Sequence, residues 1–221
     1  MKYDVFRRVN TGGKPLNNQE IRNCLADSEP RNLLNELANS DEFIMATNGS
    51  VRTTRMQAQE LVLRFISFWH ERILKEENWT YKGSMTEFLD NAIELLNESK
   101  GKHHEKIRKA FSRGMKNAYH LFGEYTFRKC VLEDFAPDAR KRLINKSLFT
   151  TWSVVLSQYD TSYIKSKTEF KTFAKKLAER LEKDRDYFDK VSYKTNDKES
   201  LKVAFGVTEE LIKTIKSDNY E

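Results

Sequence analysis

Apolar side chains recur at helical spacing through most of this chain, most clearly between about Thr54 and Lys75. In that stretch they fall on one face of a helix with about 3.6 residues per turn, and further apolar residues widen the face. The residues concerned are Leu61, Leu63, Phe65, Ile66, Phe68, Trp69, Ile73 and Leu74. A face this wide is typical of the central helix of a bundle.

Other stretches show the same alternation of apolar and polar faces. With 8 glycines and 3 prolines in 221 residues, the chain has few of the turns that an all-β fold requires. The sequence therefore predicts a mainly α fold, a multi-helix bundle of about eight helices. Besides the central helix, the predicted helices cover residues 18–26, 28 onward, 85–98, 102–122, 142–159, 169–183, 184–191 and 198–216.

Capping residues and apolar positions fix details of these helices. The predicted N-caps are Ser28 and Thr168, a predicted capping box joins Ser84 to Glu87, and Gly123 is predicted to end its helix. Leu143 and Phe170 are predicted to face inward with their helices. Arg64 lies among apolar residues, so we expect it to pair with Glu60 one turn earlier.

Net charge, cysteine content and the length of apolar runs limit which partners the chain can have. The formal net charge of +6 permits an anionic partner without requiring one. Cys24 and Cys130 are isolated, so they predict no metal site, and two reduced thiols are typical of the cytoplasm. The longest apolar runs are far shorter than the ~18 residues of a membrane span, so no membrane partner is expected.

The first residues combine a glycine loop with a helix start. Thr11-Gly12-Gly13-Lys14 predicts a tight loop, and Asn17 with Glu20 predicts a capping box for the helix that follows. Loop amides, the helix N-terminus and nearby cations together form a potential cradle for a nucleotide phosphate. The alternative is an ordinary turn. The candidate phosphate-binding residues are Arg7, Arg8, Asn10, Thr11, Gly12, Gly13 and Lys14.

This opening segment resembles a known family. Residues 6–23, which read Phe-Arg-Arg-Val-Asn-Thr-Gly-Gly-Lys-Pro-Leu-Asn-Asn-Gln-Glu-Ile-Arg-Asn, resemble the C-terminal part of the ParB/sulfiredoxin-like N-terminal domain of GmrSD-type restriction endonucleases. Weaker matches follow in order at residues 60–65, 81–85, 122–123, 142–146 and 195–196. The resemblance implies bacterial phage defence, and many relatives are known only as a domain of unknown function.

The chain departs from that family at its catalytic motifs. The family's Asp-Gly-Gln-Gln-Arg loop precedes the Asn-Thr-Gly-Gly segment, and neither it nor the His-Asn-His pattern of the partner domain occurs in this sequence. The resemblance implies that a complete relative can use an NTP and a divalent metal, whereas this chain is expected to hold no cofactor and no catalytic residue. Residues 1–26 are interpreted as a loop-helix remnant of the ParB-like α/β domain, and residues 27–221 as a helical domain.

A row of cations runs along the predicted helix at 102–122. Lys102, Lys106, Lys109, Arg113 and Lys116 are spaced by four, three, four and three residues, which puts them on one helical face. Apolar residues occupy the opposite face: Ile107, Phe111, Met115, Ala118 and Phe122. The functional interpretation is a nucleic-acid surface that contacts phosphates regardless of sequence. The alternative is an ordinary solvated face.

The sequence thus supports one hypothesis and two alternatives. We expect a truncated or split component of a GmrSD-like defence protein that binds DNA, or a separate chain carrying the missing N-terminal half, and is not catalytic alone. The first alternative is an all-α protein–protein interaction module without a nucleic-acid role. The second is half of a two-chain NTPase or nuclease.

Overall fold

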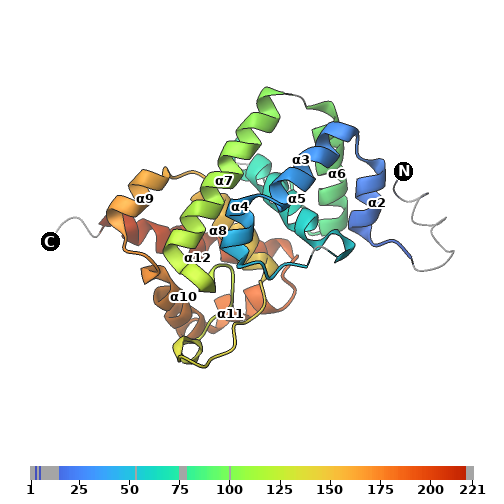
Figure 1. Cartoon of the computed structure of the whole chain (residues 1–221). Coiled ribbons are helices and arrows are strands. Elements are labelled where there is room, and N and C mark those ends of the chain that lie inside the picture. Colours follow the sequence, from blue (N-terminus) through green and yellow to red (C-terminus); the bar gives the residue numbers. More distant parts are fainter. Residues whose placement is uncertain are drawn as a thin grey trace. The chain divides into compact units, whose positions relative to one another are not determined.

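The computed structural model describes residues 3, 5, 15–52, 54–74, 79–99 and 101–217, and Figure 1 shows them as an assembly of helices. No strand occurs among these residues; one isolated antiparallel bridge joins Arg128 to Ile144. The mainly α prediction is confirmed. Eleven α-helices lie in the described part of the chain, so the estimate of about eight was too low. Short helices separated by tight turns account for the difference.

The helices have the following bounds. The α-helices are α2 (Asn18–Leu25), α3 (Ser28–Ala38), α4 (Asp41–Thr47), α5 (Gln57–Trp69), α6 (Met85–Glu98), α7 (Lys102–Phe122), α8 (Lys146–Leu156), α9 (Thr161–Lys167), α10 (Thr172–Lys183), α11 (Arg185–Ser192) and α12 (Lys198–Ser217). A π-helical turn, η2 (His70–Leu74), continues α5, and 3-10 turns form η1 (Thr54–Met56), η3 (Gly123–Tyr125) and η4 (Leu132–Phe135). No described helix is long and apolar enough to cross a membrane.

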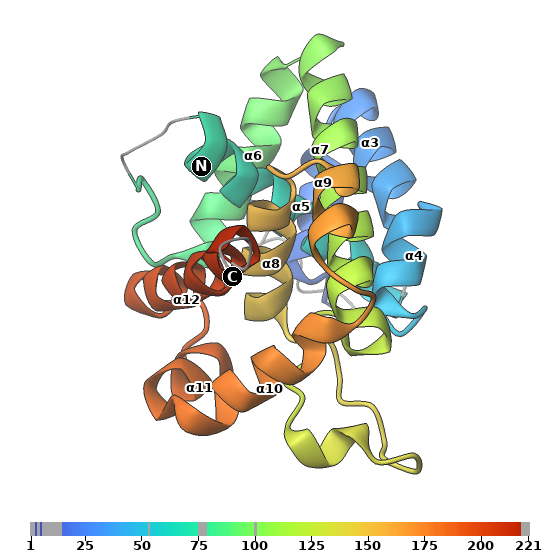
Figure 2. The same cartoon turned by 90° about the vertical axis from the view of Figure 1, so that its left-hand side faces the viewer.

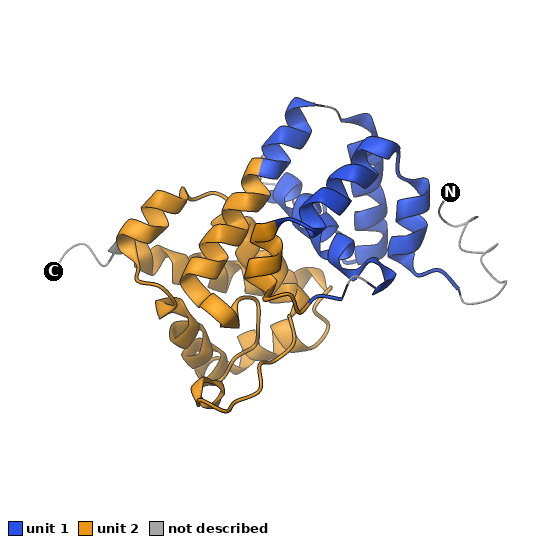
Figure 3. Ribbon diagram, viewed as in Figure 1, with its two compact units in different colours: residues 1–40, 51–108 blue, residues 41–50, 109–221 orange. Residues whose placement is uncertain are grey.

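The chain divides into two compact units, coloured separately in Figure 3. Unit 1 comprises residues 1–40 and 51–108, and unit 2 comprises residues 41–50 and 109–221. The helix α4 therefore belongs to the second unit, although it directly follows α3 in the sequence. The predicted boundary after residue 26 stays a prediction, because much of the segment before it lies outside the described residues.

In unit 1, the helix α5 is the central element, as its wide apolar face predicts. It contacts α3, α6 and α2, and every residue from Leu61 to Trp69 is buried. Arg64 is buried among them and pairs with Glu60 at 3.1 Å, which confirms the expected one-turn ion pair. A second buried pair joins Arg22 of α2 to Asp90 of α6 at 2.8 Å. These pairs let three charged side chains, those of Arg22, Arg64 and Asp90, lie inside an apolar unit.

In unit 2, α8 is the buried helix, and all its residues from Ser147 to Leu156 are inaccessible to solvent. It contacts α12, which in turn contacts α11 and α9 (Figure 2). The helix α7 approaches α8 at Gly114, where an added Cβ would lie 2.5 Å from the Ser153 carbonyl oxygen. Only glycine permits this backbone approach. Edge-to-face contact of Phe122 with Trp152 at 4.6 Å extends the core.

Several predicted helix ends are wrong by a few residues. The N-cap of α3 is Asp27 rather than Ser28. The helix α8 begins at Lys146 because Asn145 caps it, so Leu143 lies outside the helix and is 84% exposed. Thr168 ends α9 instead of capping the next helix, which starts at Thr172. Other ends are confirmed: Ser84 caps α6, and Gly123, with φ of +54°, directly follows α7.

The Arg22–Asp90 pair yields a stability prediction. Replacing Arg22 by Ala leaves the Asp90 carboxylate buried without its guanidinium, and we expect unit 1 to lose about 3 kcal/mol of unfolding free energy. Urea denaturation followed by circular dichroism measures the change. The matched control is Arg185→Ala, which removes an exposed pair with Asp189 and is expected to cost at most about 0.5 kcal/mol. Equal losses for both variants would contradict this account of the buried pair.

Candidate functional site

The predicted phosphate cradle falls outside the part of the chain that the structure describes. This applies to all seven of its residues, Arg7, Arg8, Asn10, Thr11, Gly12, Gly13 and Lys14. The capping box that follows is confirmed. Asn17 Oδ1 accepts hydrogen bonds from the N–H groups of Gln19 and Glu20 at 2.8 and 2.9 Å, and Glu20 Oε2 accepts one from the Asn17 N–H at 2.7 Å. The helix α2 thus begins after Asn17, as predicted.

The same cap is tied to the turn that precedes α5. Asn17 Nδ2 donates to the Arg55 carbonyl oxygen at 2.9 Å, and the Arg55 guanidinium donates to Glu20 at 2.8 Å and to the Pro15 carbonyl at 2.6 Å. Arg55 and Met56 both have φ of +58°, a conformation that is costly for residues with a side chain. These contacts stabilise that turn. The Glu20 carboxylate is engaged by the Arg55 guanidinium and therefore has a structural role within unit 1.

The cation row on α7 has the predicted geometry. Lys102, Lys106, Lys109 and Lys116 are exposed, Arg113 is half-buried, and the five apolar residues of the opposite face are fully buried. However, Arg113 pairs with Asp160 at 3.2 Å and donates to the Ser157 carbonyl at 2.6 Å. Lys116 pairs with Glu42 at 3.2 Å. At least two of the five charges are therefore already offset by carboxylates, which weakens the case for this row as a phosphate-binding surface.

Unit 2 contains a groove that combines aromatic rings with lysines. It has a volume of about 470 Å³ and is called here the aromatic–lysine groove. Its lining residues are Glu124, Tyr125, Phe135, Phe170, Lys171, Thr172 and Lys175. The Tyr125 and Phe135 rings contact each other, with centroids 4.4 Å apart. Phe170 is 48% exposed, which is high for a phenylalanine and contradicts its predicted inward orientation.

Lys171 builds one wall of the groove. Its φ of +67° changes the backbone direction between Phe170 and α10, which begins at Thr172. Phe170 therefore lies outside the helix and does not continue its buried face. The Lys171 N–H donates to the His120 carbonyl at 2.9 Å, and its ammonium pairs with Glu124 at 2.5 Å. The ammonium also lies 5.3 Å from the centre of the Phe170 ring. The end of α7 and the start of α10 are therefore joined at the groove.

The groove has a positive electrostatic character. Partial burial raises the pKa of Glu124, but the hydrogen bond from Lys171 and the charges of Lys171 and Lys141 outweigh it, so that pKa lies below its ordinary value. Glu124 is therefore ionised at neutral pH and offsets one of these cations. Lys175 is exposed on the groove wall. Burial also raises the pKa of Tyr125, which keeps its hydroxyl protonated.

Arg128 holds the segment that supplies Tyr125 and Phe135. Its side chain is buried, and it donates to the Glu124 carbonyl at 3.0 Å, to the Thr47 carbonyl at 3.2 Å, to Ser50 Oγ at 2.8 Å, and to the Arg142 carbonyl. Burial lowers its pKa. A planar guanidinium can serve several oxygens in fixed directions, so Arg128 joins three chain segments in unit 2.

No sequence pattern indicated the aromatic–lysine groove. Phe170 is three residues before Phe173, so periodicity assigned both to one buried face, and Tyr125 and Phe135 lie in a connector without regular spacing. A residue with positive φ at Lys171 has no signature in the sequence, because glycine or asparagine is the usual choice there. Within the described ranges, no group of three or more His, Cys, Asp or Glu residues is arranged to hold a metal ion.

Comparisons of the chain with protein-family models, with curated proteins and with solved structures found no match. The resemblance to GmrSD-type proteins therefore remains an expectation drawn from the motifs.

Arg128 gives a prediction that links stability to the groove. Lysine keeps the charge but cannot reach the same set of oxygens, so Arg128→Lys is expected to lower the unfolding free energy by about 2 kcal/mol or more. Thermal unfolding measures the loss. Arg140→Lys, at an exposed arginine further along the connector, is the control and should change stability by less than about 0.5 kcal/mol. Equal melting temperatures for the two variants would contradict the structural role of Arg128.

Proposed function

We propose that this chain is a nucleic-acid-binding component, without hydrolytic activity of its own, of a defence system resembling GmrSD. The aromatic–lysine groove is the observation that carries the proposal, since it presents rings and ammonium groups together. Single strands bind to such surfaces because every base has a π-face that stacks on an aromatic ring, while lysines contact the phosphates. The groove therefore favours a single-stranded segment over an intact duplex.

The exposed Phe170 is the principal stacking platform in this proposal. Its ring is supported from one side by Tyr119, at a centroid distance of 5.6 Å, and by His120, at 6.1 Å. Such support fixes the ring orientation, so little side-chain entropy is lost when a base stacks on it. Tyr125 and Phe135 form a second apolar wall, and stacking of this kind tolerates any base sequence.

Lys175 supplies the phosphate contact. It is exposed and lines the groove, whereas the Lys171 ammonium is engaged by Glu124 at 2.5 Å. Neutralising a phosphate releases a counterion from the strand, so binding weakens as salt rises. The cation row on α7 provides the competing hypothesis, a duplex-binding surface, which the experiment below separates from the groove.

The test measures anisotropy of a fluorescein-labelled oligothymidylate of about 12 nucleotides, at about 50 and 200 mM salt. We expect binding that weakens with salt. Phe170→Ala should reduce affinity by about 5- to 150-fold, because stacking contributes about 1–3 kcal/mol per base. Lys175→Ala should lower the salt slope by about 0.7. Tyr193→Ala removes an exposed aromatic outside the groove and should bind as the unmodified protein does.

Two results would contradict the proposal. One is the absence of binding at low salt. The other is a preference for duplex DNA that survives Phe170→Ala but is abolished when Lys106, Lys109 and Arg113 are replaced by Glu, which would assign binding to the cation row instead.

A further inference from the structure

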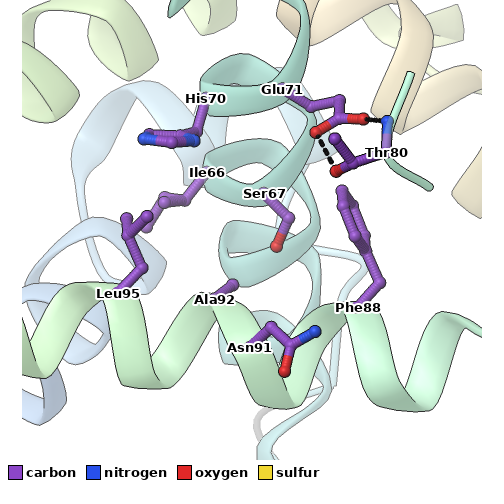
Figure 4. Close-up of a pocket in the computed structure, with 9 residues that line it drawn as sticks. All are labelled: Ile66, Ser67, His70, Glu71, Thr80, Phe88, Asn91, Ala92 and Leu95. Atoms are coloured by element: carbon purple, nitrogen blue, oxygen red, sulfur yellow. Dashed lines mark hydrogen bonds between the residues drawn. The ribbon is translucent and has the colours of Figure 1, made fainter. Parts of the chain in front are cut away.

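A separate pocket lies in unit 1, between the C-terminal part of α5 with its π-helical turn and the facing side of α6 (Figure 4). Its volume is about 140 Å³. An apolar cavity of about 150 Å³ is large enough to hold a benzene molecule. The pocket therefore has room for one six-membered ring, and it is distinct from the aromatic–lysine groove of unit 2.

The π-helical turn shapes the upper part of the pocket. Five residues, His70–Leu74, continue α5 with wider i→i+5 hydrogen bonding, an arrangement that is frequent at functional sites. His70 and Glu71 diverge there: Figure 4 shows the imidazole beside Ile66 and the carboxylate directed towards Thr80. The side chains of both residues line the pocket.

Glu71 holds the returning loop in place. It is buried, and its carboxylate accepts hydrogen bonds from the Thr80 N–H, from the Thr80 hydroxyl at 2.7 Å and from the Tyr81 N–H at 3.0 Å. Both carboxylate oxygens are thus used within the protein. The pocket wall nevertheless carries a carboxylate, and the described residues that line it include no lysine or arginine. An anionic ligand is disfavoured for this reason.

The remaining walls are apolar with two neutral polar groups. Ile66, Ala92 and Leu95 form aliphatic surface, and the Phe88 ring closes one side. The Ser67 hydroxyl donates to the Leu63 carbonyl at 2.7 Å, which leaves its oxygen as an acceptor.

The carboxamide of Asn91, an exposed residue of α6 that lines the pocket, offers both a donor and an acceptor. Apolar walls with a few placed polar groups are the usual composition of small-molecule sites.

We propose that this pocket binds a neutral molecule with a single aromatic or heteroaromatic ring and one hydrogen-bonding substituent. The ring lies against Phe88 and the aliphatic wall, and the substituent bonds to Asn91 and Ser67. This site does not depend on nucleic-acid binding in unit 2, so either proposal can fail without the other.

The test is a titration of the full chain with phenol, followed by NMR of labelled methyl groups. We expect saturable ring-current shifts at Ile66, Ala92 and Leu95, and unchanged methyl signals at Val154 in the core of unit 2. Asn91→Ala removes an exposed hydrogen-bonding group and should weaken phenol binding by about three- to tenfold. Glu98→Ala, at an exposed position of α6 outside the pocket, is the control and should leave the affinity unchanged.

A pocket-filling variant and an anionic analogue of phenol provide two further tests of the proposal. Ala92→Leu fills the pocket and should abolish the shifts while the rest of the spectrum keeps its dispersion. Phenyl phosphate, which carries the same ring with an anionic group, should bind at least about tenfold more weakly than phenol because of the Glu71 carboxylate. Shifts that do not saturate, an unaltered affinity in Asn91→Ala, or tighter binding of phenyl phosphate would each overturn the proposal.

Discussion

The buried Arg128 guanidinium is the constraint on which the candidate site of unit 2 depends. A buried cation is costly unless its donors are satisfied, and Arg128 satisfies them with carbonyl and hydroxyl oxygens from the turn after α4, from Glu124 and from Arg142. The connector between α7 and α8 has little regular structure of its own. Because Arg128 fixes both of its ends, Tyr125 and Phe135 are held as a wall rather than a mobile loop.

The second constraint is the left-handed residue Lys171. Its backbone bonds to the end of α7 and its ammonium to Glu124, so a strained conformation is stabilised by two contacts in one place. The consequence is that Phe170 is turned out of the core and becomes accessible. An exposed aromatic ring costs folding free energy that a buried one would contribute. Residues that give up stability in this way are typical of binding sites, and this supports a role for the groove.

Local features of the fold could be predicted from the sequence because they depend on neighbours. The capping box of Asn17 with Glu20, the Glu60–Arg64 pair and the buried face of α5 all follow from spacings of three or four residues. The candidate sites could not be predicted in the same way. Arg128 finds partners 78 and 81 residues away, and no single-sequence pattern reports such pairings.

The unit 1 pocket has a similar origin. Glu71 bonds to a loop nine and ten residues further on, and the π-helical turn that directs it inward has no clear sequence signal. His70, the first residue of that turn, lines the pocket as well. The phosphate cradle at residues 7–14 remains a prediction, as does the resemblance that motivates it.

The central claim is that single-stranded nucleic acid lies in the aromatic–lysine groove with its bases against the rings. Photo-crosslinking with an oligonucleotide carrying 5-iododeoxyuridine tests it most directly, because the excited base reacts with an aromatic side chain that it stacks on. Mass spectrometry of the digested complex should locate the crosslinks at Phe170, with further ones at Tyr125 or Phe135. Crosslinks confined to peptides outside the groove, or none under conditions where the strand is bound, would contradict the claim.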